Sequence, residues 1–249
     1  MNNLARIAEW TLIRNLIIFA LSAAAFGCTL KQPPQFNLAE FTMTEDLPYD
    51  SPAQVIYRID DHRFVTLEHY RDCNHGESFY NDTKKNLRSK IGNGYFENYR
   101  GKIVNADPSG NNIVLPLAYP PHVACGKQGC ATFLWYSTDS GQTFHALTYI
   151  PRSFDPYKES RNYKVFANED AIYVSQRVTP DPRIVETIKY PMIPGFVYFP
   201  NRELPGGKHI EFYVEAPRGL HSPSYQDHVT CDASIKPTNP NAPLAKDRQ

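Results

Sequence analysis

The sequence predicts an all-β fold: an antiparallel meander that forms either a sandwich or a small or incomplete β-propeller. Short β-branched and aromatic runs alternate with clusters of Gly, Pro, Asn and Asp, and no stretch keeps a helical period for three turns. We expect strands at residues 54–59, 63–68, 78–80, 102–105, 112–118, 131–137, 144–150, 163–166, 171–176, 185–190, 196–199 and 209–215.

Residues 1–27 are expected to be an export signal. Arg6 and Arg14 precede an apolar run at residues 16–26. About eleven residues are too few for a membrane span, which needs roughly 20, but they fit the apolar part of a secretory signal. The segment is therefore predicted to be removed after export.

The end of this run, Ala25-Phe26-Gly27-Cys28, resembles the lipobox of bacterial lipoproteins, although Phe26 replaces the usual small residue. We therefore expect lipidation of Cys28, with an ordinary cleaved signal as the alternative. Thr29 follows the cysteine, in place of the aspartate that often retains lipoproteins in the inner membrane. The expected location is the outer membrane, facing the periplasm.

Two proline-rich segments are expected to flank the domain. Residues 28–53 are predicted to be a lipidated N-terminus and tether, with a reach of roughly 25 Å. Residues 234–249 contain scattered lysines and show no apolar period, so we expect a disordered tail. Residues 54–233 remain as one β-rich domain. Their formal charge is balanced and basic residues do not cluster, which argues against a nucleic-acid partner.

Four cysteines follow Cys28, and an even number in an exported chain predicts disulfides. Cys125 and Cys130 flank a short loop bounded by glycines, which leaves Cys73 to pair with Cys231. The second bridge would close a loop of about 160 residues and contribute on the order of 4 to 5 kcal/mol. A zinc site is the alternative, but the chain has no CxxC and its histidines lack ligand spacing, so we expect no metal.

One predicted hairpin carries a signature, Ser137-Thr138-Asp139-Ser140-Gly141-Gln142-Thr143-Phe144, which resembles the Asp-box of sialidase-like propellers. Asp139 is expected to accept hydrogen bonds from the turn, with Ser137 at its start. Gly141 is expected to adopt positive φ, Thr143 to add a hydroxyl bond, and Phe144 to pack beneath the sheet. The motif predicts a hairpin and says nothing about catalysis. A single copy leaves sandwich and propeller both open, because a propeller needs repeated blades.

The motif search predicts neither a catalytic site nor a cofactor. The chain lacks GxSxG, HExxH, a phosphate-binding glycine loop and a dinucleotide fingerprint. Asp60-Asp61-His62 could supply metal ligands or an acid–base group, but this composition between two strands favours a tight turn. Residues 221–228 contain the residue types of a catalytic triad. They are too close in sequence to converge as a triad, so a polar loop is expected.

Residues 190–200 form the stretch richest in aromatic residues and proline. Rigid aromatic side chains on loops make good anchors for a protein partner, so Phe196, Tyr198 and Phe199 are candidate partner-binding residues. The alternative is a β-hairpin whose aromatic side chains fill the core.

The segment Tyr57-Arg58-Ile59-Asp60-Asp61-His62-Arg63-Phe64-Val65-Thr66-Leu67-Glu68, with Cys73 and Phe79-Tyr80-Asn81-Asp82-Thr83 beyond it, resembles Tli-type immunity lipoproteins. These proteins neutralise lipase effectors of type VI secretion. The resemblance is most specific over residues 54–91 and extends more loosely to about Tyr173.

This resemblance implies a non-enzymatic protein that binds a phospholipase-like effector in the periplasm and blocks its substrate entrance or its mobile lid. The expected partners are the cognate lipase effector and, through the lipid anchor, the membrane. One alternative is a sialidase-like lipoprotein that binds or hydrolyses glycans, which the Asp-box suggests. The other alternative is a structural lipoprotein of the envelope.

Overall fold

The computed structural model describes residues 47–91, 95–179, 181 and 184–243, which form three separate β-sheets. All of these residues lie within one of the two units into which the chain divides, Phe36–Gln249. The predicted signal, Cys28, the tether up to residue 46 and residues 244–249 lie outside the described residues. In the part of the chain that is described, no helix is long and apolar enough to cross a membrane.

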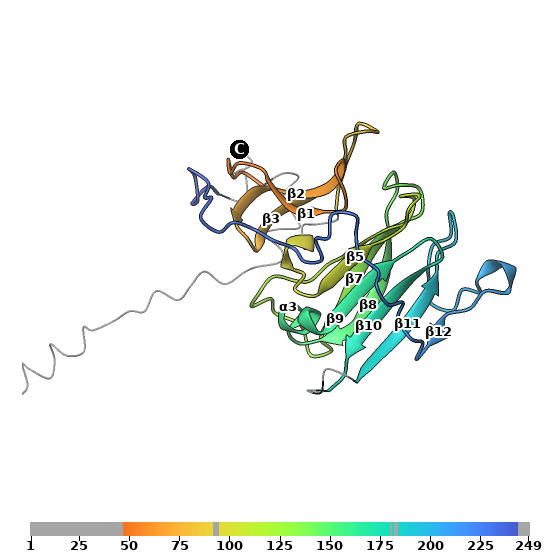
Figure 1. Cartoon of the computed structure of the whole chain (residues 1–249). Coiled ribbons are helices and arrows are strands. Elements are labelled where there is room, and N and C mark those ends of the chain that lie inside the picture. Colours follow the sequence, from red (N-terminus) through yellow and green to blue (C-terminus); the bar gives the residue numbers. More distant parts are fainter. Residues whose placement is uncertain (1–46, 92–94, 180, 182–183, 244–249) are drawn as a thin grey trace, which may run out of the picture. The chain divides into compact units, whose positions relative to one another are not determined.

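The first sheet is a four-stranded antiparallel meander whose strands follow one another in chain order (Figure 1). Its strands are β1 (Gln54–Arg58), β2 (Arg63–Asp72), β3 (His75–Asp82) and β4 (Leu87–Lys90). The strand pattern of the sequence predicts the first three. It misses β4, a short edge strand that alternates between half-buried and exposed residues and contains few strongly β-forming side chains.

Strand β1 departs from the two-residue alternation of a regular strand. The register shifts between Val55 and Tyr57, so that Ile56 and Tyr57 are both fully buried and Val55 is exposed. A β-bulge of this kind places one extra residue in the strand and breaks the two-residue period. Tyr57 is thereby held in the core, where burial raises its pKa to about 12.

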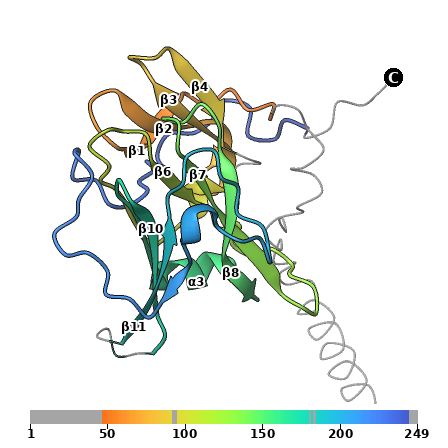
Figure 2. The ribbon, with the colours of Figure 1, turned by 90° about the vertical axis from the view of Figure 1, so that its right-hand side faces the viewer.

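The second sheet contains three antiparallel strands, β6 (Ile113–Pro116), β7 (Cys130–Ser137) and β8 (His145–Ser153), with β7 in the centre (Figure 2). In β7, Leu134 and Tyr136 are buried, whereas Phe133 and Trp135 point to the other face and stay partly exposed. The sheet therefore has one face in the core and one face that is only partly covered.

The third sheet has five strands in the order β12-β11-β10-β9-β5. They are β5 (Lys102–Asn105), β9 (Tyr163–Ala167), β10 (Ala171–Arg177), β11 (Val185–Pro191) and β12 (Glu211–Phe212). Strand β5 pairs with β9 in parallel, while the other pairs are antiparallel. The all-β prediction is confirmed. The parallel pair departs from the expected antiparallel meander, because the chain builds the whole second sheet between β5 and β9.

The helical segments are short. They are η1 (Phe96–Asn98), α3 (Pro156–Glu159), η2 (Ser160–Asn162) and η3 (Pro205–Gly207). One apolar cluster draws residues from all three sheets, among them Tyr80, Leu134 and Val165. The sheets therefore share a core and support one another.

The C-terminal segment lies along β1. The Ser224 N–H donates to the Ile59 carbonyl at 3.0 Å, and the Thr230 N–H donates to the Ile56 carbonyl at 2.8 Å. Beyond residue 234, where a disordered tail is expected, the Thr238 N–H donates to Asp50 Oδ1 at 2.7 Å and Asn239 Nδ2 donates to the Pro48 carbonyl at 2.8 Å. The folded part thus includes residues 47–53 and 234–243, because the two ends satisfy each other's polar groups over a long range that local composition does not show.

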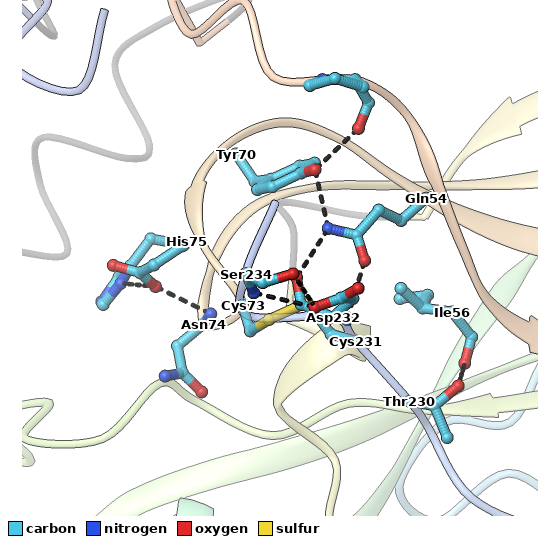
Figure 3. Close-up of a disulfide and its surroundings, with 12 residues drawn as sticks. Gln54, Ile56, Tyr70, Cys73, Asn74, His75, Thr230, Cys231, Asp232 and Ser234 are labelled. Atoms are coloured by element: carbon cyan, nitrogen blue, oxygen red, sulfur yellow. Dashed lines mark hydrogen bonds and ion pairs between the residues drawn. A yellow bond between two sulfur atoms is a disulfide. The ribbon is translucent and has the colours of Figure 1, made fainter. Parts of the chain in front are cut away.

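Both predicted disulfides are present. Cys73 and Cys231 are separated by 158 positions in sequence, with Cα atoms 5.9 Å apart, and Cys125 and Cys130 are separated by 5 positions and 5.2 Å. Figure 3 shows Gln54 beside the longer bridge, where its amide exchanges two hydrogen bonds with the main chain of Asp232. The disulfide and this amide fasten the C-terminal segment to the first sheet.

Candidate functional site

The hairpin between β7 and β8 has the hydrogen bonds expected of its turn residues. Asp139 Oδ1 accepts from the Thr143 N–H at 2.9 Å, Asp139 Oδ2 accepts from the Thr143 hydroxyl at 2.6 Å, and the Ser137 hydroxyl accepts from the Gly141 N–H at 2.8 Å. Gly141 has a φ of 84°, and a Cβ there would lie 2.3 Å from the Tyr80 ring. Phe144 packs edge-on against Tyr80, at 5.5 Å between ring centroids. The turn thus joins the second sheet to the first.

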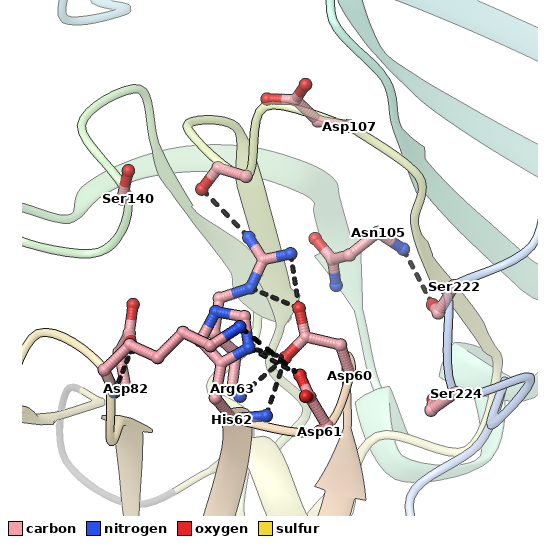
Figure 4. A network of polar contacts seen from close by, with 12 residues as sticks. Asp60, Asp61, His62, Arg63, Asp82, Asn105, Asp107, Ser140, Ser222 and Ser224 are labelled. Carbon is pink, nitrogen blue, oxygen red and sulfur yellow. Dashed lines mark hydrogen bonds and ion pairs between the residues drawn. The ribbon is translucent and has the colours of Figure 1, made fainter.

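The Asp60-Asp61-His62 segment forms the β1–β2 turn, as expected. The carboxyl of Asp60 accepts hydrogen bonds from the His62 and Arg63 N–H groups and pairs with the Arg63 guanidinium at 2.7 Å. Burial raises the pKa of Asp60, but the hydrogen bonds from Arg63 and from the main chain outweigh burial and lower it. Figure 4 shows Arg63 reaching onward to the loop that contains Asp107, where it donates to the Gly110 carbonyl at 3.0 Å.

These three residues are close enough to hold a cation. The Asp60 carboxylate, however, is already neutralised by the buried Arg63, whose charge would repel a metal ion. The arrangement is that of a structural turn.

The segment at residues 221–228 is a loop, as expected. The Ser222 hydroxyl is buried and lies 3.1 Å from the Tyr57 hydroxyl, and it also accepts from the Asn105 N–H at 3.0 Å. His221 stacks on Tyr225, with ring centroids 4.2 Å apart, and His228 pairs with Asp227. Ser222 therefore ties the loop to β5 and the core.

The buried carboxyl of Glu97, in η1, is held by neighbouring side chains. Its Oε2 accepts from the Ser78 hydroxyl at 2.8 Å, and its Oε1 accepts from Asn98 Nδ2 at 3.1 Å. Burial raises the pKa of Glu97 well above its usual value. The Glu97 carboxyl accepts both of these hydrogen bonds within the core and is closed off from a substrate.

The candidate partner-binding residues Phe196, Tyr198 and Phe199 lie in a segment without regular secondary structure that follows a turn at residues 194–195, where a strand is expected at residues 196–199. Phe196 is buried, and Tyr198 packs edge-on against it at 5.2 Å. The Tyr136 hydroxyl donates to the Phe196 carbonyl at 2.9 Å and accepts from the Tyr198 N–H at 3.1 Å. Phe199 is 62% exposed. Phe196 is therefore buried, Tyr198 is partly buried and packs against the core, and Phe199 is accessible to a partner.

A pocket of about 320 Å³ lies on the partly covered face of the second sheet. We call it the Trp135 pocket, and it is lined by Tyr95, Leu117, Ala118, Tyr119, Thr132, Phe133, Trp135 and Ala146. None of these lining side chains is charged. The Tyr95 and Tyr119 rings pack together at one side, with centroids 5.0 Å apart.

Three buried polar atoms of this pocket make no hydrogen bond to the described part of the protein. They are the Tyr95 hydroxyl, the Thr132 hydroxyl and the indole Nε1 of Trp135. Burial raises the pKa of Tyr95, and the neighbouring Tyr119 and Glu97 raise it further, so the phenol stays protonated. Each of the three groups is therefore a buried hydrogen-bond donor that lacks a partner among the described residues.

Sequence reasoning misses this pocket. The expected strands at residues 112–118 and 131–137 contain most of its lining, and the alternation in β7 places Phe133 and Trp135 on the same face. The sequence signal that could have indicated the pocket is this pair of large apolar side chains on the face of β7 that points away from the core. Tyr95 and Tyr119 lie outside regular strands, so their approach to β7 is not visible in any sequence period.

Comparison with known protein families identifies a match. The T6SS Tli3 immunity protein family matches residues 49–176, just over half of the chain. This range contains the first and second sheets, both ends of the Cys125–Cys130 disulfide and every residue that lines the Trp135 pocket. None of the curated proteins matches the chain. The resemblance at Tyr57–Glu68 is confirmed, and the chain belongs to the T6SS Tli3 immunity protein family.

Proposed function

We propose that this immunity protein binds a type VI secretion lipase effector in the periplasm and blocks its activity. The family membership carries the proposal, because an immunity protein has a cognate effector as its partner. The proposal that this effector is a lipase rests on the resemblance of residues 54–91 to Tli-type proteins.

The disulfides support an extracytoplasmic location. Bonds such as Cys73–Cys231 form and persist in oxidising compartments, including the bacterial periplasm. The proposed export signal at residues 1–27 and the proposed lipid on Cys28 agree with this location. A lipid anchor in the outer membrane would keep the protein beside the membranes that a lipase attacks.

The side chains that could act in catalysis are engaged in contacts that stabilise the fold. This favours inhibition by binding over turnover of a substrate. Asp60 is paired with Arg63, and Ser222 bonds to Tyr57 and Asn105. Both groups therefore hold the fold together. The proposed action is stoichiometric occlusion of the effector's substrate entrance or lid.

The test is a titration of lipase activity. A candidate type VI secretion lipase effector, such as the product of a neighbouring lipase gene, is mixed with increasing amounts of the protein lacking residues 1–28. We expect activity to fall to the background at a fixed molar ratio, and the two proteins to elute together. Hydrolase activity of the immunity protein alone, or protection without a complex at micromolar concentration, would contradict the proposal.

The location is tested separately. The Cys28→Ser protein should leave the membrane fraction while still binding the effector in solution. Unchanged membrane association would rule out the lipid anchor without affecting the inhibition.

A further inference from the structure

Basic residues that are dispersed along the sequence meet around one pocket of the third sheet. The pocket has a volume of about 180 Å³, and we call it the basic pocket. Its lining includes the cationic residues Arg100, Lys102, Arg161, Lys164 and Arg177 and contains no acidic side chain. Positive charge is therefore concentrated here, in a chain whose formal net charge is zero.

These five cationic residues are exposed, so their charged groups can be reached from solvent. Lys102 pairs with Asp227 at 2.7 Å, whereas the other four form no ion pair with the described residues. Arg177 donates to Asn162 Oδ1 at 2.6 Å, and the Arg100 guanidinium lies 5.6 Å from the centroid of the Tyr157 ring. Such contacts with neutral groups orient a guanidinium but leave its charge unmatched.

The register of the third sheet places two of the cationic residues opposite each other. Lys102 in β5 and Lys164 in β9 are partners in the parallel pair. Like charges directly opposite each other across two strands destabilise a sheet. Asp227 compensates Lys102, but Lys164 has no acidic partner among the described residues. A bound anion would relieve this repulsion.

We infer that the basic pocket receives acidic side chains of the effector, whose carboxylates pair with Arg161, Lys164 and Arg177. This inference rests on the proposed function and identifies a surface through which the effector is bound.

The chemistry and the size of the pocket define the bound group. Guanidinium and ammonium groups donate hydrogen bonds and accept none, so the ligand must supply anionic oxygen atoms. The volume of about 180 Å³ is below the roughly 300–1,000 Å³ typical of small-molecule sites. The pocket therefore suits a carboxylate that projects from a partner, and it is too small for most whole metabolites.

The construction of the pocket favours a protein partner over an anionic membrane. Surfaces that bind anionic lipids usually carry their Lys and Arg residues on one juxtamembrane segment or one amphipathic helix. Here the cationic residues come from separate segments and surround a hollow that is also lined by the buried Ser175. A projecting side chain can enter such a hollow, whereas a plane of lipid headgroups meets mainly its rim. All of the cationic residues except Arg177 lie within the range that matches the immunity protein family.

The first test reverses charge in the pocket of the protein lacking residues 1–28. Arg161→Glu combined with Lys164→Glu should weaken binding of the candidate lipase effector by about 100-fold at low salt, because like charges repel across an interface. Slower association should account for most of the loss, and added salt should weaken the wild-type complex more than the variant complex.

The matched control combines Lys127→Glu with Lys208→Glu. It makes the same change of net charge at exposed lysines outside the pocket. This control should bind the effector within about threefold of the wild type, because isolated surface charges contribute little. An equal loss of binding in the control would mean that net charge governs association, and it would overturn the inference.

A second measurement separates recognition from a structural role. Lys164→Gln removes one of two facing charges, so the melting temperature of the unbound protein should stay the same or rise. Effector binding should weaken by about fivefold, as expected for loss of one exposed ion pair. A lower melting temperature with unchanged binding would assign Lys164 a structural role and overturn the inference.

The third test identifies the acidic group directly. A carbodiimide, which couples amines to carboxylates without a spacer, is added to the complex, and the joined peptides are identified by mass spectrometry. We expect Lys164 to be joined to an aspartate or glutamate of the effector. The Lys102–Asp227 pair should be joined within the chain and is the internal control. Links from Lys127 or Lys208 to the effector, with none from Lys164, would overturn the inference.

The outcomes separate the two proposals. If the wild type binds the effector and the charge-reversed variant binds it equally well, the inference is overturned and the proposed function stands. If the wild type binds no effector at micromolar concentration, both fail. Phosphatidylglycerol vesicles are titrated in parallel. If the charge-reversed variant loses the vesicles but keeps the effector, the pocket is a lipid site and the inference is overturned.

Discussion

The two faces of the second sheet differ in whether the polar atoms of their aromatic side chains have hydrogen-bond partners. The two residues compared, Trp135 and Tyr136, are neighbours in β7. Tyr136 points into the core, where its hydroxyl bonds to the main chain of both Phe196 and Tyr198. Trp135 points to the other face, and its indole nitrogen has no partner among the described residues. One face is closed by the chain's own turn, and the other face keeps an open pocket.

This difference shows that aromatic content alone does not identify an interface. The run at residues 190–200 is the more aromatic, yet its side chains mostly pack on each other, with Tyr190 and Tyr198 edge-on at 5.7 Å. The Trp135 pocket is assembled from separate segments and leaves donors unpaired. Unpaired buried donors, more than aromatic content, therefore distinguish the two regions.

The largest effect is expected from the two disulfides. Cys73–Cys231 fastens the C-terminal segment to the first sheet, whereas Cys125–Cys130 closes a short loop that ends where β7 begins. Replacing both cysteines of the long bridge by serine should lower the free energy of unfolding by about 5 kcal/mol, and replacing the short bridge by about 2 kcal/mol, because a longer closed loop restricts the unfolded chain more. Urea unfolding of the two double variants measures this difference. Equal losses would show that loop closure does not govern their contributions.

An intermediate effect on the free energy of unfolding is expected when the phenylalanines at the closed face are replaced by alanine, and the two residues should differ. Phe196→Ala removes a buried ring and should lower the free energy of unfolding by about 3 to 5 kcal/mol. Phe199→Ala removes an exposed ring and should change it by less than about 0.5 kcal/mol. Thermal and urea unfolding of the pair check the assignment. A similar loss in both proteins would mean that Phe199 also belongs to the core.

The smallest effect on the free energy of unfolding is expected when a tyrosine is replaced by phenylalanine. The same change is compared on the two faces of the second sheet. Tyr136→Phe leaves the Phe196 carbonyl and the Tyr198 N–H without their partner, so the free energy of unfolding should fall by about 1 to 3 kcal/mol. Tyr95→Phe removes a hydroxyl that has no partner in the described structure, so it should be neutral or slightly stabilising. Unfolding curves recorded under the same conditions give both values. Destabilisation by Tyr95→Phe would break the comparison and indicate that its hydroxyl is already satisfied.

Local patterns predict much of the fold because strand alternation and turn chemistry act over a few residues. The expected strands at 102–105 and 171–176 agree closely with β5 and β10, and the β7–β8 hairpin forms around Asp139. The errors occur where distant segments decide the outcome. The parallel β5–β9 pair and the packing of Phe196 beside Tyr136 each depend on a neighbour that lies far along the chain.

By itself, the sequence determined the all-β class, the family and both disulfide pairings, since each depends on residue types, their spacing or their number. The tertiary structure decided that Phe196 packs inward, that residues 234–243 join the folded part, and that Tyr95, Thr132 and Trp135 surround one cavity. The physical reason is that the burial of a side chain and the pairing of its polar atoms depend on which distant segments pack against it. The strand period of β7 puts Trp135 and Tyr136 on opposite faces, but only the packing of other segments closes one face and leaves the other open.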